Sequence, residues 1–241
     1  MRTPVTRYLR WHAADFIVER GLPLLIVNTL FVVQLAVMLR VKAGDGPVDR
    51  AAATIVLSSL LGVVGFTGAM IAVNGIVSND RKHGYFRFLF AKPVSVAAYY
   101  ALAFVVSAAG MLVCGAAFLG GFARYVAPVV APGALLFLMM YFVAVGGLGF
   151  LLSVVTRYDW IALGAIWVAT QLARDAFPAE RYAAAKALLL LLPPTHLVQP
   201  MSLAVLRGEH VGALDGIWLV GYGVAAFVLG VILVRRRSLA A

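Results

Sequence analysis

The sequence predicts an all-α integral membrane protein with six transmembrane helices. Of its 241 residues, 63% are hydrophobic and only 12% are charged, and the mean hydropathy is +0.97. Soluble domains contain about 45–50% apolar and about 25% charged residues. The apolar residues also form continuous runs, whereas the strands of a membrane β-barrel are alternating segments of roughly 10 residues. Residues 1–241 are therefore expected to form a single transmembrane domain.

Residues 1–21 precede the first apolar run and are expected to form an amphipathic helix on the membrane surface. Charged side chains point in other directions than the apolar ones, and Tyr8 and Trp11 suit the headgroup region. A disordered basic segment is the alternative. The apolar residues that follow helical spacing are Val5, Leu9, Ala13, Phe16 and Ile17.

Six apolar runs are long enough to cross roughly 30 Å of hydrocarbon as helices of about 20 residues. Helices are expected because they satisfy every backbone amide internally, as lipid requires. The fifth run is the shortest and approaches a full span only if it continues past Arg174, whose side chain can extend toward the headgroups. The runs are Leu22–Leu39, Ala52–Val77, Val96–Phe122, Val126–Val155, Trp160–Ala173 and Ile217–Val234.

The positive charges of the connecting segments predict that both termini are cytoplasmic. With the amino terminus inside, the cytoplasmic segments hold 12 of the 20 Lys and Arg residues and have a net charge of +8, against +2 for the outer segments. Lys and Arg are enriched in cytoplasmic loops. The expected location is the cytoplasmic (inner) membrane of the cell, with multiple passes.

Residues 174–216 are expected to form an outer helical hairpin that dips partly into the membrane, rather than a seventh span. Pro193 and Pro194 interrupt its apolar run, and Lys186 would be buried without an evident partner. Irregular backbone at this depth must pack on protein, either the bundle or a second copy. His196 is a further candidate residue of the hairpin, but together with Met201 it provides too few ligands to predict a metal site.

Residues 80–95 form a short basic and aromatic segment between the second and third runs. Gly84 can end or bend the helix, Pro93 can stop the next one, and Ser95 is a candidate N-cap of the third span. Tyr85 and Phe88 share one helical face. Such a segment is expected to contact a partner and is joined at both ends to membrane helices. The alternative is that its cations only fix the topology.

This segment resembles the cytoplasmic loop after the second helix in permease subunits of ABC-type exporters, the second export-permease superfamily. The resemblance rests on an acid-Arg-x-x-Gly order followed by Pro-Val-Ser, carried by Asp80, Arg81, Gly84, Leu89, Pro93, Val94 and Ser95. The resemblance extends to the amphipathic helix expected over residues 1–21, the six predicted spans and the interrupted hairpin expected over residues 174–216. It implies that the loop is a coupling helix that docks on an ATPase subunit. The residues implied in this coupling are Asp80, Arg81, Gly84, Tyr85, Phe86, Arg87, Phe88, Leu89 and Pro93.

The ATPase itself is expected to be a separate polypeptide. The chain contains no Gly-x-x-x-x-Gly-Lys-Ser/Thr phosphate loop, so ATP and Mg would be bound by the partner, with no cofactor and no catalytic residue in this chain. ATP-binding subunits of this class work in pairs. The resemblance therefore implies two ATPase copies and two permeases, the second being another copy or a related chain.

Other classes of function fit the sequence less well. The net charge of +10 is explained by topology and anionic headgroups, so no nucleic-acid partner is expected. Acidic residues are missing from the centres of the predicted spans, which disfavours a proton-coupled carrier. The alternative kept open is a membrane-embedded scaffold or assembly subunit that transports nothing itself. The transported substrate is not indicated by the residues.

Overall fold

The computed structural model describes residues 4–43, 49–82, 95–176 and 191–238, and every regular element within these ranges is a helix. The all-α prediction is confirmed. Five helical segments are long and apolar enough to cross a membrane, which identifies a multi-pass membrane protein. They are Thr6–Leu39, Arg50–Asp80, Val96–Tyr125, Ala131–Val155 and Ala213–Arg236.

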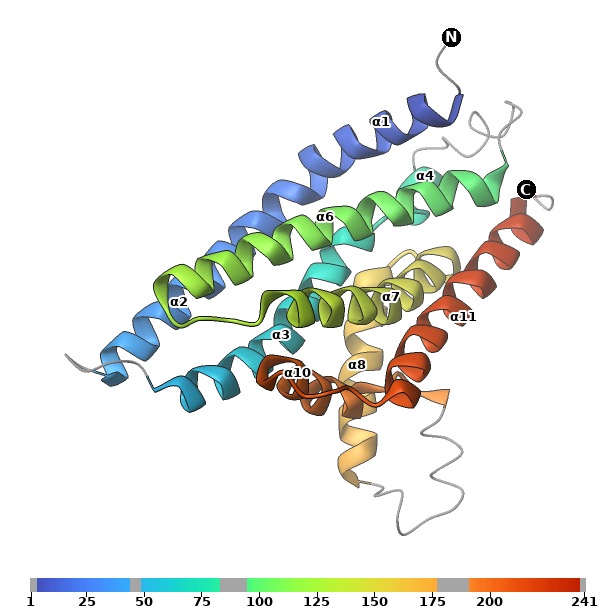
Figure 1. Ribbon diagram of the computed structural model, residues 1–241. Coiled ribbons are helices and arrows are strands. Elements are labelled where there is room, and N and C mark those ends of the chain that lie inside the picture. The colour runs from blue at the N-terminus through green and yellow to red at the C-terminus, as the bar shows by residue number, and fades with distance from the viewer. Residues whose placement is uncertain (1–3, 44–48, 83–94, 177–190, 239–241) are drawn as a thin grey trace.

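The first of these segments combines three elements into one long helix. Helix α1 (Pro4–Phe16) continues through the π-turn η1 (Ile17–Gly21) into α2 (Leu22–Ala43). The composite helix runs alongside α6 (Val96–Tyr125) (Figure 1). The ring of Phe16 is buried against Gly110 of α6, where a Cβ atom would overlap it. Residues 4–21 are thus helical and packed on the bundle, and their placement on a membrane surface stays a prediction.

The second predicted span is interrupted near its end. Helix α3 (Arg50–Val73) is capped by Asp49, whose carboxylate accepts a hydrogen bond from the Ala51 amide at 3.0 Å. It ends at Val73 because Gly75 adopts a left-handed conformation with φ of +73°, which glycine tolerates best. A short helix, α4 (Ser78–Lys82), follows the break.

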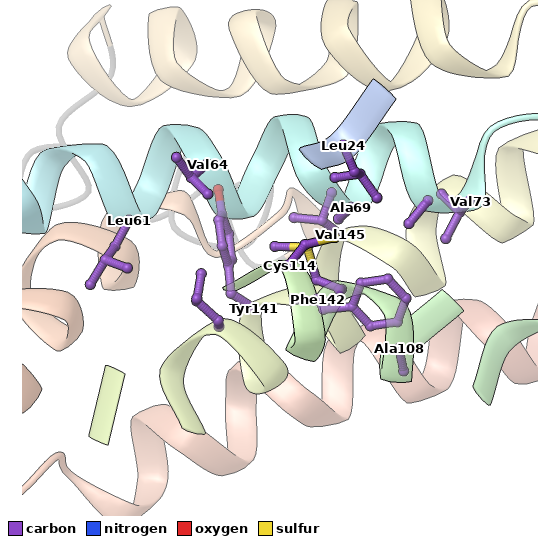
Figure 2. Close-up of a cluster of buried hydrophobic side chains, with 14 of the residues drawn as sticks. Leu24, Leu61, Val64, Ala69, Val73, Ala108, Cys114, Tyr141, Phe142 and Val145 are labelled. Atoms are coloured by element: carbon purple, nitrogen blue, oxygen red, sulfur yellow. The ribbon is translucent and has the colours of Figure 1, made fainter. Parts of the chain in front are cut away.

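Helix α7 (Ala131–Val155) is the most buried of the five long helices. It crosses α11 (Ala213–Ser238) so closely that a Cβ atom on Gly147 would overlap the carbonyl of Gly223. Small residues permit such close backbone contact between membrane helices. Figure 2 shows part of the core formed by α2, α3, α6 and α7, with labels on Leu24, Leu61, Val64, Ala69, Val73, Ala108, Cys114, Tyr141, Phe142 and Val145.

Helix α8 (Asp159–Ala176) coincides with the fifth predicted span but is not among the five long apolar helices. It has only 18 residues, and Asp159, Arg174 and Asp175 are all charged. It nevertheless carries the chain from the end of the bundle where α7 stops to the end where α11 begins. The first turn of α1 and the last turn of α11 accordingly lie toward the end of the bundle that carries α4 (Figure 1). The six-span layout stays a prediction.

The hairpin predicted over residues 174–216 is described in part, because residues 177–190 lie outside the described ranges. A 3-10 turn, η2 (Thr195–Leu197), leads into α10 (Val198–Arg207). Helix α10 packs on α3, where the Ser202 hydroxyl donates to the Ser58 carbonyl at 3.1 Å. Gly208, with φ of +73°, ends α10 in a left-handed conformation.

Candidate functional site

A buried carboxylate joins two distant parts of the chain at the end of the bundle that carries α4. Asp159, the first residue of α8, is 4% exposed. One of its oxygens, Oδ2, accepts hydrogen bonds from the Gly75 amide at 3.0 Å and the Ser78 hydroxyl at 3.2 Å. The other, Oδ1, accepts from the Trp160 amide at 3.0 Å. We call Gly75, Ser78 and Asp159 the Asp159 junction.

Local sequence explains why Asp159 lies where it does. Helix α7 ends at Val155, and the Thr156 hydroxyl accepts a hydrogen bond from the Tyr158 amide at 3.0 Å, which turns the chain. An acid at the first turn of α8 is favoured by the partial positive charge of a helix amino terminus. A buried carboxylate needs hydrogen-bond donors, and the break after α3 exposes the Gly75 amide as one of them.

A second hydrogen bond attaches α4 to α6. The Tyr100 hydroxyl donates to Asp80 Oδ2 at 3.2 Å, and the Tyr100 side chain is fully buried. Helix α4 is thus attached to α6 through Asp80 and to α8 through Ser78. Two helices that are separate in the sequence hold the segment that leads into residues 83–94.

The predicted coupling residues are only partly within the described structure. Asp80 and Arg81 belong to α4, and the Arg81 side chain is not described. Ser95 precedes α6 as expected: its carbonyl accepts from the Tyr99 amide at 3.0 Å, although its hydroxyl makes no capping hydrogen bond. The remaining predicted coupling residues lie outside the described residues: Gly84, Tyr85, Phe86, Arg87, Phe88, Leu89 and Pro93.

A polar cavity of about 230 Å³ lies beside α4, between α1, η1, α6 and the end of α3. Next to it, the last turn of α3 receives hydrogen bonds from two neighbouring elements. Arg20 Nη1 donates to the Ala72 carbonyl at 3.4 Å, and the Ser107 hydroxyl donates to the same oxygen at 3.0 Å. These contacts satisfy a carbonyl that the helix end leaves without a partner. The polar residues that line the cavity include His12, Asp15, Glu19, Arg20, Asn79 and Asp80.

Pro193 and Pro194 of the predicted hairpin lie beside the middle of α7 and α8. Pro193 and Pro194 are buried near Tyr141, and Arg174 Nη2 donates to the Pro193 carbonyl at 3.1 Å. His196 is exposed on η2. Partial desolvation, followed by the nearby Arg174 cation, lowers the pKa of His196. The structure therefore does not bring the hairpin candidates together with Asp80 and Arg81.

Sequence reasoning missed the Asp159 junction. The Asn74–Gly75 pair is a turn signal inside an apolar run, and it could have shortened the second span. Asp159 follows a short polar link and opens a helix, which is an N-terminal signal. Their pairing had no local signal, because the two positions are 84 residues apart.

No protein-family model matches the sequence, and no curated protein matches it. Within the described ranges, no three His, Cys, Asp or Glu side chains are grouped so that they could hold a metal ion. The candidate site is therefore defined by its own residues: the Asp159 junction, the Asp80–Tyr100 hydrogen bond and the adjacent cavity.

Proposed function

We propose that this chain is the permease subunit of an ABC-type exporter of the second export-permease superfamily. In this role it forms the translocation pathway and couples to a separate ATPase subunit that binds ATP and Mg. The proposal is supported by the pattern of residues 80–95, by the multi-pass helical bundle and by the position of the start of α1 and the end of α11 toward the same end of the bundle. Residues 83–94 would be the surface that docks on the ATPase.

The attachment of α4 is the observation that carries this proposal. A coupling segment must transmit movement, and a segment fixed only by its two chain connections would move alone. Ser78 is hydrogen-bonded to Asp159 of α8, and Asp80 is hydrogen-bonded to Tyr100 of α6. Displacement of residues 83–94 by an ATPase would therefore act on α3, α6 and α8 together.

The proposed arrangement has six spans, with α8 as the fifth, and both termini in the cytoplasm. An 18-residue helix is about 27 Å long, slightly less than the roughly 30 Å of a hydrocarbon core, and small mismatches of this size are tolerated. Two permeases, identical or related, would pair with two ATPases in the inner membrane. A scaffold subunit would need neither a moving α4 nor an ATPase.

The test uses whichever ATPase co-purifies with the tagged chain from its native membrane. Arg87→Glu or Phe88→Ala should weaken association with the ATPase because both lie on the proposed docking surface. Asp159→Asn should leave association unchanged and reduce stimulation of ATP hydrolysis by the permease, because it weakens the attachment of α4 to α8 and lies outside the proposed docking surface. Asp175→Asn, an exposed acid at the other end of α8, is the matched control. Absence of any ATPase in the purified complex would favour the scaffold, and unchanged behaviour of all variants would refute the coupling role.

A further inference from the structure

The polar cavity beside α4 has an excess of negative charge. Among the described residues that line it, Asp15, Glu19 and Asp80 carry carboxylates and Arg20 carries a guanidinium. Arg20 also interacts electrostatically with Asp159. Among the described residues, neither Asp15 nor Glu19 forms an ion pair within 4 Å. Asp15 and Glu19 therefore offer carboxylate acceptors at the cavity wall, so the cavity favours a cation.

His12 is a second, independent feature of the same cavity. His12 lines the cavity and is only 7% exposed as a residue, and its ring packs against that of Tyr99 with 4.6 Å between the ring centroids. Its Nε2 atom is buried and has no hydrogen-bond partner in the described part of the chain. An unpartnered buried polar atom is unfavourable and uncommon in native structures. A ligand that donates a hydrogen bond to this nitrogen would remove the penalty.

The position of the cavity determines what can reach it. It lies where the long apolar part of α3 ends and α6 begins, so it borders the apolar span instead of lying in its middle. Trp11 and Tyr99 also line it. Trp and Tyr are enriched at the depth of lipid headgroups, and their rings attract cations. A group that is positively charged and located at headgroup depth fits these walls.

We propose that this cavity binds a primary ammonium group, carried either by the headgroup of phosphatidylethanolamine or by a soluble amine. An ammonium has three N–H donors and no acceptor. Asp15, Glu19 and the imidazole of His12 supply acceptors for these donors, and charge-assisted hydrogen bonds of this kind are the strong ones. A quaternary choline group has the same charge but no N–H donor. The cavity should therefore discriminate between the two.

The experiment uses the purified full chain in detergent micelles, without any ATPase, so its outcome is independent of the proposed function. Binding is measured by native mass spectrometry for phosphatidylethanolamine and phosphatidylcholine with identical acyl chains, and by calorimetry for ethanolamine and choline. We expect at least roughly tenfold tighter binding of the primary amine in one or both pairs. Preference in the lipid pair alone identifies the headgroup as the ligand, and preference in the soluble pair alone identifies a free amine. Equal binding of amine and choline forms in both pairs would overturn the proposal.

Variants locate the binding at this cavity. Glu19→Gln, at an exposed position where folding is not at risk, should weaken binding of the preferred amine by roughly tenfold, and Asp15→Asn should do the same. His12→Phe keeps the ring packing on Tyr99 but removes the nitrogens, and should reduce the preference over choline. Glu209→Gln, an exposed acid at the opposite end of the bundle, is the matched control and should bind as the wild type does. Full retention of binding in Glu19→Gln and Asp15→Asn would overturn the assignment.

Discussion

The carboxylate of Asp159 accepts a hydrogen bond from the backbone amide of Gly75, 84 positions earlier in the chain. The same carboxylate oxygen accepts the hydroxyl of Ser78. A side chain at the start of α8 therefore stabilises the break between α3 and α4. Because this contact is buried, its removal should be visible in stability as well as in function.

Replacement of Asp159 by alanine should destabilise the protein by about 2–4 kcal/mol, because the Gly75 amide and the Ser78 hydroxyl lose their shared acceptor in a buried site. Asp159→Asn keeps one oxygen acceptor and should have about half this effect. Ser78→Ala removes one donor and should cost about 1 kcal/mol. Thermal or denaturant unfolding of the purified protein in micelles gives these values. If the Asp159→Ala protein were as stable as the wild type, the Asp159 junction would not contribute to stability.

Replacement of Gly75 by alanine should destabilise the break for two reasons. The φ of +73° costs a residue with a Cβ atom about 1–2 kcal/mol, and the new Cβ would also overlap the Asn79 side chain. Gly208→Ala separates the two effects, since Gly208 has the same φ of +73° but no atom within 4 Å of its Cβ position. Unfolding measurements should show a larger loss for Gly75→Ala than for Gly208→Ala. Equal losses would mean that overlap with Asn79 contributes nothing.

Replacement of Gly147 by alanine should separate α7 from α11, because the new Cβ would overlap the carbonyl of Gly223. Overlap with backbone in a packed interface cannot be relieved by a rotamer change, so a loss of about 1–3 kcal/mol or more is expected. Gly221→Ala is the matched control on α11, since nothing lies within 4 Å of its Cβ position. It should be neutral or slightly stabilising through its helix propensity. A greater loss for Gly221→Ala than for Gly147→Ala would refute this packing.

Labelling of single cysteines can decide whether α8 spans the bilayer. In a Cys114→Ala background, Tyr158→Cys and Asp175→Cys place exposed thiols just before α8 and near its end. If α8 is the fifth span, an impermeant reagent should label the two positions from opposite sides of sealed vesicles. Labelling from the same side would reduce the protein to five spans and overturn the predicted orientation of its carboxyl terminus.

Continuous apolar runs made most of the fold predictable. The third run, predicted over Val96–Phe122, corresponds to α6 over Val96–Tyr125. The fourth begins later than predicted, at Ala131 instead of Val126, because the chain forms an irregular link that contains Pro128. Hydrophobicity reports where a helix can lie in lipid but does not report helix ends.

The candidate site was less predictable because its key contacts join separate spans. The composition of residues 80–95 indicated a specialised segment, and its attachment through Tyr100 was not visible in the sequence. Tyr100 lies in an apolar run where an aromatic residue normally belongs to the core. Only the folded bundle shows that its hydroxyl is a donor to Asp80.

The π-turn at Ile17–Gly21 also determines the relative orientation of the two halves of the first long helix. A π-turn accommodates one residue more than an α-turn without ending the helix, and each residue advances an α-helix by about 100°. Deletion of one residue within η1 would therefore convert it into a regular α-turn and leave α1 and α2 in nearly their present relative orientation, whereas a residue lost from a regular α-helix is accommodated only by a rotation of about that angle. Phe16 would then keep its position against Gly110. The extra residue of this turn is thus one that the first long helix can lose without changing which side chains face α6.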